Sequence, residues 1–312
     1  MAGPIVRYTT VADEIRNRRE TLDAFTDGAV RFLFGLGKKM LLANQLGLLA
    51  DQVYATRPEF LTTALAWLGA AAYTGQIYFD FSGYSDMAIG LGRMFGFHFL
   101  ENFNYPYLSQ SVTEFWRRWH ISLSTWFRDY LYIPLGGNRC AHWKHIRNIL
   151  VVWALTGLWH GAAWNFLCWG LYFGLLLLGE KYGWGRILER APAALRHLYA
   201  MVLIVVSWVL FRAETLDYAV RFLQAMAGFA QGGLTDGRTT YYLLEFRWEL
   251  LLAIPAAMPV KSWLQNWLES KSGAAAQALL AWGPKLIALG MFGLSFLRLV
   301  SSSFNPFIYF RF

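Results

Sequence analysis

The longest stretch of this chain without Asp, Glu, Lys or Arg runs over 32 residues, from Asn148 to Gly179. A helix that crosses about 30 Å of hydrocarbon needs only about 20 residues. The stretch therefore predicts either one long tilted membrane helix or a broken span followed by a second one. Gly157, Gly161 and Gly170 favour the broken form, because glycine adopts the backbone conformations that a break requires.

The composition of the 312 residues indicates an integral membrane protein. Apolar residues make up 56% and charged residues 15%, whereas a typical soluble domain carries about 25% charged residues. Aromatic residues reach 18% and include 15 Trp, and Trp and Tyr favour the membrane–water interface. A soluble protein of this length would need more polar surface than this chain has.

Four further segments are candidate membrane spans because they are apolar and carry few charges. They are Phe60–Phe79, His197–Phe211, Leu250–Val260 and Ser272–Leu297. Two more apolar segments carry charges at membrane depth: Gly28–Ala50 contains Arg31, Lys38 and Lys39, and Phe81–Phe99 contains Asp86 and Arg93. Such charges are costly in a bilayer unless they face protein or water, so we expect them to line an interior cavity. Amphipathic helices on the membrane surface are the alternative.

Three polar segments predict loops, namely Arg7–Glu20, Arg139–Arg147 and Ala230–Thr240. The net charge is +8, but Lys and Arg are dispersed between apolar segments rather than gathered in one stripe. This pattern predicts membrane lipids as partners and no nucleic acid. Cys140 and Cys168 have no metal or redox spacing, and we expect both to be free thiols. Asp80 and Asp86 also lack metal spacing, so no metal site is predicted.

The densest cluster of unusual residues is Thr113–Tyr132, with sequence TEFWRRWHISLSTWFRDYLY. Read as one helix, it places two sets of side chains on different faces. They are Phe115, Trp119, Ser122 and Trp126 on one face, and Arg117, His120 and Ser124 on another. Arg128 and Asp129 are adjacent, so we expect them to face different partners. A membrane-surface helix with an aromatic belt is the alternative to a functional site.

His160 lies inside the long uncharged stretch and is a second candidate for chemistry. An ionisable residue within a span is a functional hypothesis by default. Burial favours the neutral imidazole, which accepts a proton and suits a general base in acyl transfer. A structural histidine bonded to a neighbouring helix is the alternative. Other enzyme patterns are absent: the sequence has no Gly-x-Ser-x-Gly elbow, no His-Glu-x-x-His helix and no phosphate-binding loop.

Several blocks in order resemble the membrane-bound O-acyltransferase family. They are Tyr78–Met87 (YFDFSGYSDM), Phe103–Leu108 (FNYPYL), Phe115–Tyr132 (FWRRWHISLSTWFRDYLY), Pro134–Arg139 (PLGGNR), Thr156–Trp164 (TGLWHGAAW) and Pro306–Phe312 (PFIYFRF). The similar branch is that of bacterial alginate O-acetyltransferase membrane subunits, near the teichoic-acid D-alanyl transferases and the peptidoglycan O-acetyltransferases. The resemblance covers nearly the whole chain and is strongest from Tyr78 to Glu180.

The resemblance implies an all-α polytopic membrane protein, a ring of tilted and broken transmembrane helices around a central funnel, in the bacterial inner membrane. It implies a single membrane-embedded domain over residues 1–312, with its catalytic core at about 78–180. Family members usually carry several membrane helices before a segment like Ala2–Tyr8, so we expect this chain to be a C-terminal portion.

The resemblance also implies the site. The expected catalytic residues are His160 and His120, and the expected substrate-binding residues are Trp119, Arg117, Arg118, Trp159 and Asp129. The implied acyl donor is acetyl-CoA or another cytoplasmic acyl thioester, with no bound cofactor. The implied acceptor is an exopolysaccharide, reached directly or through periplasmic acetyl-transfer partner proteins.

Three other interpretations stay open. The first is D-alanyl or peptidoglycan acyl transfer by the same mechanism. The second is a transporter that moves acyl donors without chemistry, since it would also need broken helices and buried charge. The third is an inactive fragment.

Overall fold

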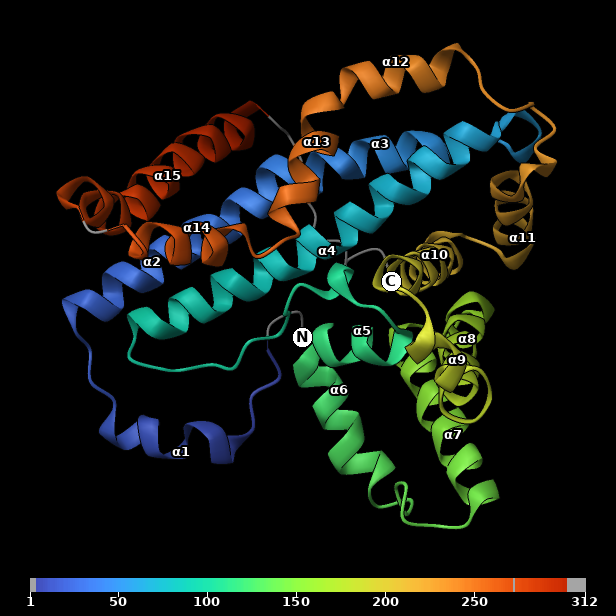
Figure 1. Ribbon diagram of the computed structural model, residues 1–312, viewed down its shortest axis with the longest axis horizontal. Coiled ribbons are helices and arrows are strands. Elements are labelled where there is room, and N and C mark those ends of the chain that lie inside the picture. The colour runs from blue at the N-terminus through green and yellow to red at the C-terminus, as the bar shows by residue number, and fades with distance from the viewer. Residues whose placement is uncertain (1–3, 272, 302–312) are drawn as a thin grey trace. The chain divides into compact units, whose positions relative to one another are not determined.

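The computed structural model describes residues 4–271 and 273–301. All regular structure in those residues is helical (Figure 1), which confirms the predicted all-α class. The chain divides into two compact units. Within the described residues, unit 1 comprises 4–47, 75–102 and 246–301, and unit 2 comprises 48–74 and 103–245. The predicted motif Pro306–Phe312 lies outside the described residues, and so do residues 1–3.

Unit 1 contains seven helical segments and one end of α4. They are α1 (Tyr8–Asn17), α2 (Leu22–Gly37), the π-helical η1 (Lys38–Ala43), the start of α3 (Asn44–Tyr54), residues 75–94 of α4 (Thr63–Met94), α13 (Arg247–Ala256), α14 (Val260–Glu269) and α15 (Ala274–Ser301). Because η1 continues directly from α2 into α3, the chain is helical without interruption from Leu22 to Tyr54.

Helices α2 and α4 pack backbone to backbone through two pairs of glycines. A Cβ on Gly28 would lie 2.5 Å from the carbonyl oxygen of Gly90, and one on Gly35 would lie 2.5 Å from that of Gly83. The pairing of an early residue with a late one makes the two helices antiparallel. Small residues at such contacts let helices approach closely, which strengthens van der Waals packing where lipid replaces water.

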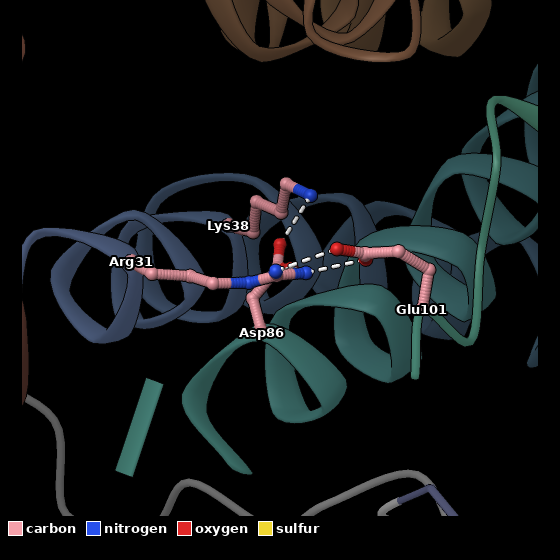
Figure 2. A network of polar contacts seen from close by, with 4 residues as sticks. All are labelled: Arg31, Lys38, Asp86 and Glu101. Carbon is pink, nitrogen blue, oxygen red and sulfur yellow. Dashed lines mark hydrogen bonds and ion pairs between the residues drawn. The ribbon is translucent and has the colours of Figure 1, made fainter. Parts of the chain in front are cut away.

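The charges that the sequence places at membrane depth pair with one another across this contact. Asp86 accepts hydrogen bonds from Arg31 at 2.9 Å and from Lys38 at 2.7 Å, and Arg31 also donates to Glu101 at 2.5 and 2.6 Å (Figure 2). Asp80 pairs with Lys39, and both side chains are buried. Mutual pairing therefore explains how these helices carry charge.

Unit 2 holds the remaining segments. They are η2 (Pro58–Phe60), η3 (Pro106–Leu108), α5 (Val112–Arg118), α6 (Ile121–Phe127), η4 (Arg128–Tyr132), α7 (His142–His160), α8 (Trp164–Leu178), η5 (Gly179–Gly183), α9 (Gly185–Arg190), α10 (Ala193–Arg212), α11 (Leu216–Gln224), η6 (Ala225–Phe229) and α12 (Gly237–Glu245). Residues 48–54 of α3 and residues 63–74 of α4 also belong to unit 2. Its core is largely aromatic, with Trp169, Trp208, Phe115 and Phe173 fully buried.

Two helices in the described part of the chain, α10 and α15, are long and apolar enough to cross a membrane by length and composition. They correspond to the predicted spans His197–Phe211 and Ser272–Leu297. The predicted span Phe60–Phe79 has wrong bounds, because α4 is 32 residues long and continues past Asp80 and Asp86 to Met94. Those carboxylates are paired with cations, so they do not end the helix.

Other boundaries also differ from the predictions. Leu250–Val260 is not one span: α13 ends at Ala256, just after Pro255, and its 10 residues extend only about 15 Å. The predicted loop Arg7–Glu20 contains α1, and Arg139–Arg147 already includes the start of α7. The predicted loop Ala230–Thr240 passes into α12 at Gly237. Cys140 and Cys168 are free thiols, as predicted.

Candidate active site

The uncharged stretch forms a helical hairpin, which confirms the broken form of the prediction. Helix α7 ends at His160, Gly161 is extended with φ 164° and ψ 160°, and α8 begins at Trp164. Gly157 and Gly170 bring the two helices into backbone contact: a Cβ on Gly157 would lie 2.3 Å from the carbonyl oxygen of Phe166. The hairpin thus places His160 at its turn, as the last residue of α7.

His160 is half-buried in an aromatic setting. Its ring meets Trp159 at 4.8 Å, Trp169 at 5.1 Å and Phe211 at 5.0 Å between centroids, in each case edge to face. Such arrangements are the favoured geometry for aromatic pairs. Within residues 4–271 and 273–301 the imidazole makes no hydrogen bond. Its orientation is therefore fixed by packing, and its nitrogens stay available to a substrate.

His120 occupies a break between α5 and α6. Trp119 ends α5 with extended angles, and His120 follows with φ 42° and ψ 54° in the left-handed region. This conformation costs about 1–3 kcal/mol in a residue other than glycine, and such strain clusters at functional sites. The prediction of one helix over Thr113–Tyr132 is therefore wrong. Figure 1 shows the two short helices meeting at an angle, which changes the faces assigned from helical spacing.

The two histidines are linked by a chain of ring contacts that runs from Trp119, the neighbour of His120, through Trp208 and Trp169 to His160. The His120 side chain is buried, with its ring 6.3 Å from Phe103 and its Nδ1 3.5 Å from the Ser122 hydroxyl. One aromatic cluster supports both imidazoles: Trp119 contacts Trp208 at 5.0 Å. The cluster reaches His160 through the rings of α8 and α10.

Glu180, in η5 directly after α8, is a residue that the sequence analysis did not predict. Its carboxylate accepts hydrogen bonds from the backbone N–H of Val112 at 2.7 Å and of Thr113 at 2.8 Å. It also accepts from the Thr113 hydroxyl at 2.6 Å and from the Tyr199 hydroxyl at 3.3 Å. A carboxylate at a helix N-terminus satisfies N–H groups that have no partner within the helix. The signal in the sequence is a single acid directly after 32 uncharged residues.

Trp119 and Trp159, two of the predicted substrate-binding residues, lie beside the two histidines. Trp119 is buried in the aromatic cluster, and Trp159 stacks its edge on His160 with 39% of its surface exposed. A ligand at His160 would meet the exposed part of Trp159.

The three predicted polar substrate-binding residues, Arg117, Arg118 and Asp129, have different surroundings. Arg118 pairs with Glu114 at 2.8 Å and donates to the Asn104 carbonyl, so its position is explained within the protein. Asp129 pairs with its own neighbour Arg128 at 2.7 Å. The expectation that Arg128 and Asp129 face different partners is therefore wrong. The long Arg128 side chain turns back toward the neighbouring residue of η4. Arg117 is exposed and lines a cavity.

This cavity, of about 710 Å³, lies among α5, α6, α7, α9 and α10. One of its walls is a single face of α7, formed by His145, Ile149, Val152 and Thr156. Their spacing of three or four residues continues to His160, one turn beyond Thr156. The same helix face therefore joins the cavity to the candidate catalytic residue.

Comparison with known proteins shows which family the sequence resembles. The model of the membrane-bound O-acyltransferase family (MBOAT) matches residues 1–215. The probable alginate O-acetylase AlgI of Azotobacter vinelandii is 43% identical over 340 aligned positions, covering 100% of this chain and 67% of that protein. The probable alginate O-acetylase AlgI of Pseudomonas aeruginosa is 49% identical over 236 positions, covering 76% of this chain and 45% of that protein.

A peptidoglycan O-acetyltransferase of Helicobacter pylori is 37% identical over 236 positions, which cover 73% of this chain and 44% of that protein. The alignments thus span from under half to about two thirds of these relatives' lengths. The family match includes the hairpin, both histidines and Glu180. On these grounds the chain belongs to the membrane-bound O-acyltransferase family.

Proposed function

We propose that this chain carries the acyl-transfer site of an O-acetyltransferase in the bacterial inner membrane that serves O-acetylation of an exopolysaccharide such as alginate. The observation that carries the proposal is His160, an imidazole without a hydrogen-bond partner among the described residues, fixed at a hairpin turn beside a second, strained histidine. The relatives named alginate O-acetylase support the choice of polymer, at 43% and 49% identity.

In the proposed reaction His160 acts as the general base. It accepts the proton of the acceptor hydroxyl as that oxygen attacks the carbonyl carbon of the acetyl thioester. The new C–O bond forms, the C–S bond breaks, and the thiolate of the donor leaves with the electron pair and takes up the proton. A transient acetyl group on the imidazole would divide the transfer into two steps. His120 supplies the second imidazole beside this centre. Its neighbour Trp119 packs against Trp208 in the aromatic cluster.

The proposal assigns the donor, acetyl-CoA, to the cytoplasmic side and the acceptor to the opposite side of a multi-pass protein. A ring of helices around a funnel would connect the two sides, and periplasmic partner proteins would relay the acetyl group to the polymer. Support comes from the family and from the two apolar helices α10 and α15. Peptidoglycan is the second candidate acceptor, because of the 37% identical relative.

The test is ester-linked acetate on the extracellular polysaccharide of a host that depends on this chain for acetylation. His160→Ala at matched membrane expression should lower the acetate by a factor of about 10²–10⁴, the usual contribution of a general base. His98→Ala is the control, since its ring is exposed and pairs with Glu14 in unit 1. Unchanged acetate in the His160 variant, or no acetate with the unmodified chain, would contradict the proposal.

A further inference from the structure

The cavity beside α7 carries more positive charge than its own carboxylates offset. Four cations line it: Arg117, Arg128, Lys181 and Arg196. Of these, Arg128 already pairs with Asp129. The other three have no ion pair among the residues that the structure describes.

The three carboxylates that line the cavity do not supply the missing partners. Glu180 is occupied by the N-terminus of α5, and Glu114 by Arg118 and the backbone N–H of Gln110. Glu189 is exposed. Arg117 and Lys181 are exposed and Arg196 is half-buried, so three cations without an ion pair line the same open cavity. Like charges that line one cavity repel one another, and an anion bound between them would relieve this repulsion.

Lys181 is held by a neutral partner. Its ammonium lies 3.1 Å from Nε2 of His145, whose Nδ1 is 2.7 Å from the Tyr182 hydroxyl. The Tyr132 hydroxyl also approaches Nε2 of His145, at 2.8 Å. This network fixes the direction of the ammonium group without neutralising it. Because His145 lies at the start of α7, the network marks the polar end of the cavity.

Arg196 provides an independent sign of a ligand. Its Nε is buried and has no hydrogen-bond partner among the described residues. Buried donors are nearly always paired in folded proteins, so an exception calls for an acceptor that the chain itself does not supply.

We propose that the polar end of this cavity is a phosphate-binding site formed by Lys181, Arg196 and Arg117. The planar guanidinium donates two parallel hydrogen bonds to a phosphate, and the lysine adds a point charge. The remaining wall of Val152, Trp153 and Trp116 suits an uncharged group attached to that phosphate. A volume of about 710 Å³ lies within the range of small-molecule sites.

Two sources offer this chemistry, a phosphorylated acyl-thioester donor and the headgroup of an anionic phospholipid. The first source rests on the proposed function, whereas the phosphate chemistry does not. A phosphorylated acyl-thioester donor fits the geometry of α7, because the 15 residues from His145 to His160 rise about 22 Å along one face. A donor held by its phosphate at the polar end would extend along that face toward His160.

The experiment measures binding by calorimetry on the purified full chain in a neutral detergent. The probes are inorganic pyrophosphate and coenzyme A, followed by competition with micelles containing phosphatidylglycerol or phosphatidylcholine. Lys181→Gln and Arg196→Gln should each weaken pyrophosphate binding at least about tenfold, the usual loss for one charge-assisted hydrogen bond. Arg186→Gln is the matched control, because Arg186 is exposed on α9 and does not line the cavity.

Lys181→Arg keeps the charge and should keep binding, which separates a lost contact from a misfolded variant. Competition by coenzyme A assigns the site to the donor, and competition by phosphatidylglycerol but not phosphatidylcholine assigns it to a lipid headgroup. Either result supports a phosphate site. Pyrophosphate binding that is absent, or equal in the control and the two glutamine variants, overturns it. His160→Ala should bind normally, so a failure of the acetylation test leaves this result independent.

Discussion

His120 combines a buried imidazole with a left-handed backbone, a conformation that Tyr105 shares among the described residues. Its left-handed conformation costs a residue with a Cβ about 1–2 kcal/mol, a cost that glycine avoids and asparagine reduces. The imidazole occupies this position nonetheless, buried beside Trp119. Because strain of this kind clusters at functional sites, we predict that the His120 side chain serves the acyl transfer.

His120→Asn separates these two contributions. Asparagine tolerates the left-handed backbone, so the thermal unfolding temperature in detergent should stay close to that of the unmodified chain. Acetate on the polysaccharide should fall at least about tenfold, because the second imidazole is gone. His120→Ala should lose as much acetate and unfold at a lower temperature. Full acetylation by the asparagine variant would show that the imidazole is not required.

The sequence predicts which residues matter better than how the backbone presents them. His160 could be found because an ionisable group stands out in an uncharged stretch. The turn at His120 could not, because Trp119-His120 contains neither glycine nor proline to mark a break. The pairing of Arg128 with Asp129 was missed for a related reason: helical spacing describes where side chains begin, whereas a long arginine can turn back on its neighbour.

At the scale of helices, Glu180 links the two pieces of the candidate site. The Glu180 carboxylate, in η5 just after α8, accepts hydrogen bonds from the first N–H groups of α5, and α5 ends at Arg118, two residues before His120. His160, the last residue of α7, lies four residues before the other end of α8. We therefore predict that Glu180 is a positioning residue, which helps to hold the helix before His120 against the helix after His160 without touching either imidazole.

Glu180→Gln should loosen this link. The amide keeps one acceptor but places an NH₂ group opposite an N–H donor and removes the charge. We expect a loss of about 1.5–3 kcal/mol in the free energy of unfolding, measured by denaturant titration in detergent. Glu189→Gln, an exposed acid of α9, is the control. If Glu180 acts through α5, the double variant Glu180→Gln/His120→Asn acetylates no worse than His120→Asn alone. A further drop would contradict the positioning role.

Helix type was predictable from the sequence, but helix ends were not. The run of apolar residues correctly predicts helices at α7, α8, α10 and α15. The end placed at Phe79 is wrong because a single sequence does not reveal that Lys39 lies opposite Asp80. Likewise, the acid at position 180 is visible in the sequence, whereas the helix N-terminus that it binds comes from 67 residues earlier in the chain.

At the scale of the whole molecule, the charges of the apolar helices in unit 1 are paired with one another in partly buried positions. Asp86 serves two cations of the α2–η1 helix, and Arg31 extends the network to Glu101 beyond the end of α4 (Figure 2). The Arg31, Lys38 and Asp86 side chains retain only 19–27% of their exposure. Removing one member of a partly buried network costs more than removing a surface pair, because the remaining charges stay desolvated.

Asp86→Asn tests the weight of this network in the stability of the chain. It removes the carboxylate shared by Arg31 and Lys38, and we expect a loss of about 1–3 kcal/mol in the free energy of unfolding. Asp27→Asn is the matched control, since Asp27 pairs with Arg93 at an exposed position, and its loss should stay within about 0.5 kcal/mol. Denaturant titration of both variants in the same detergent gives the comparison. Equal losses would show that the network adds nothing beyond a surface ion pair.

The glycine contact of the α7–α8 hairpin limits which substitutions evolution can accept there. A Cβ on Gly157 or on Gly170 would meet a backbone carbonyl oxygen at 2.3 or 2.2 Å, and no rotamer change relieves a clash with main chain. Neither position therefore offers a neutral first step to another residue. Gly283, Gly290 and Gly293 of α15 have open space around them and are free to drift. Over generations the hairpin that carries His160 should stay fixed in sequence while α15 diversifies.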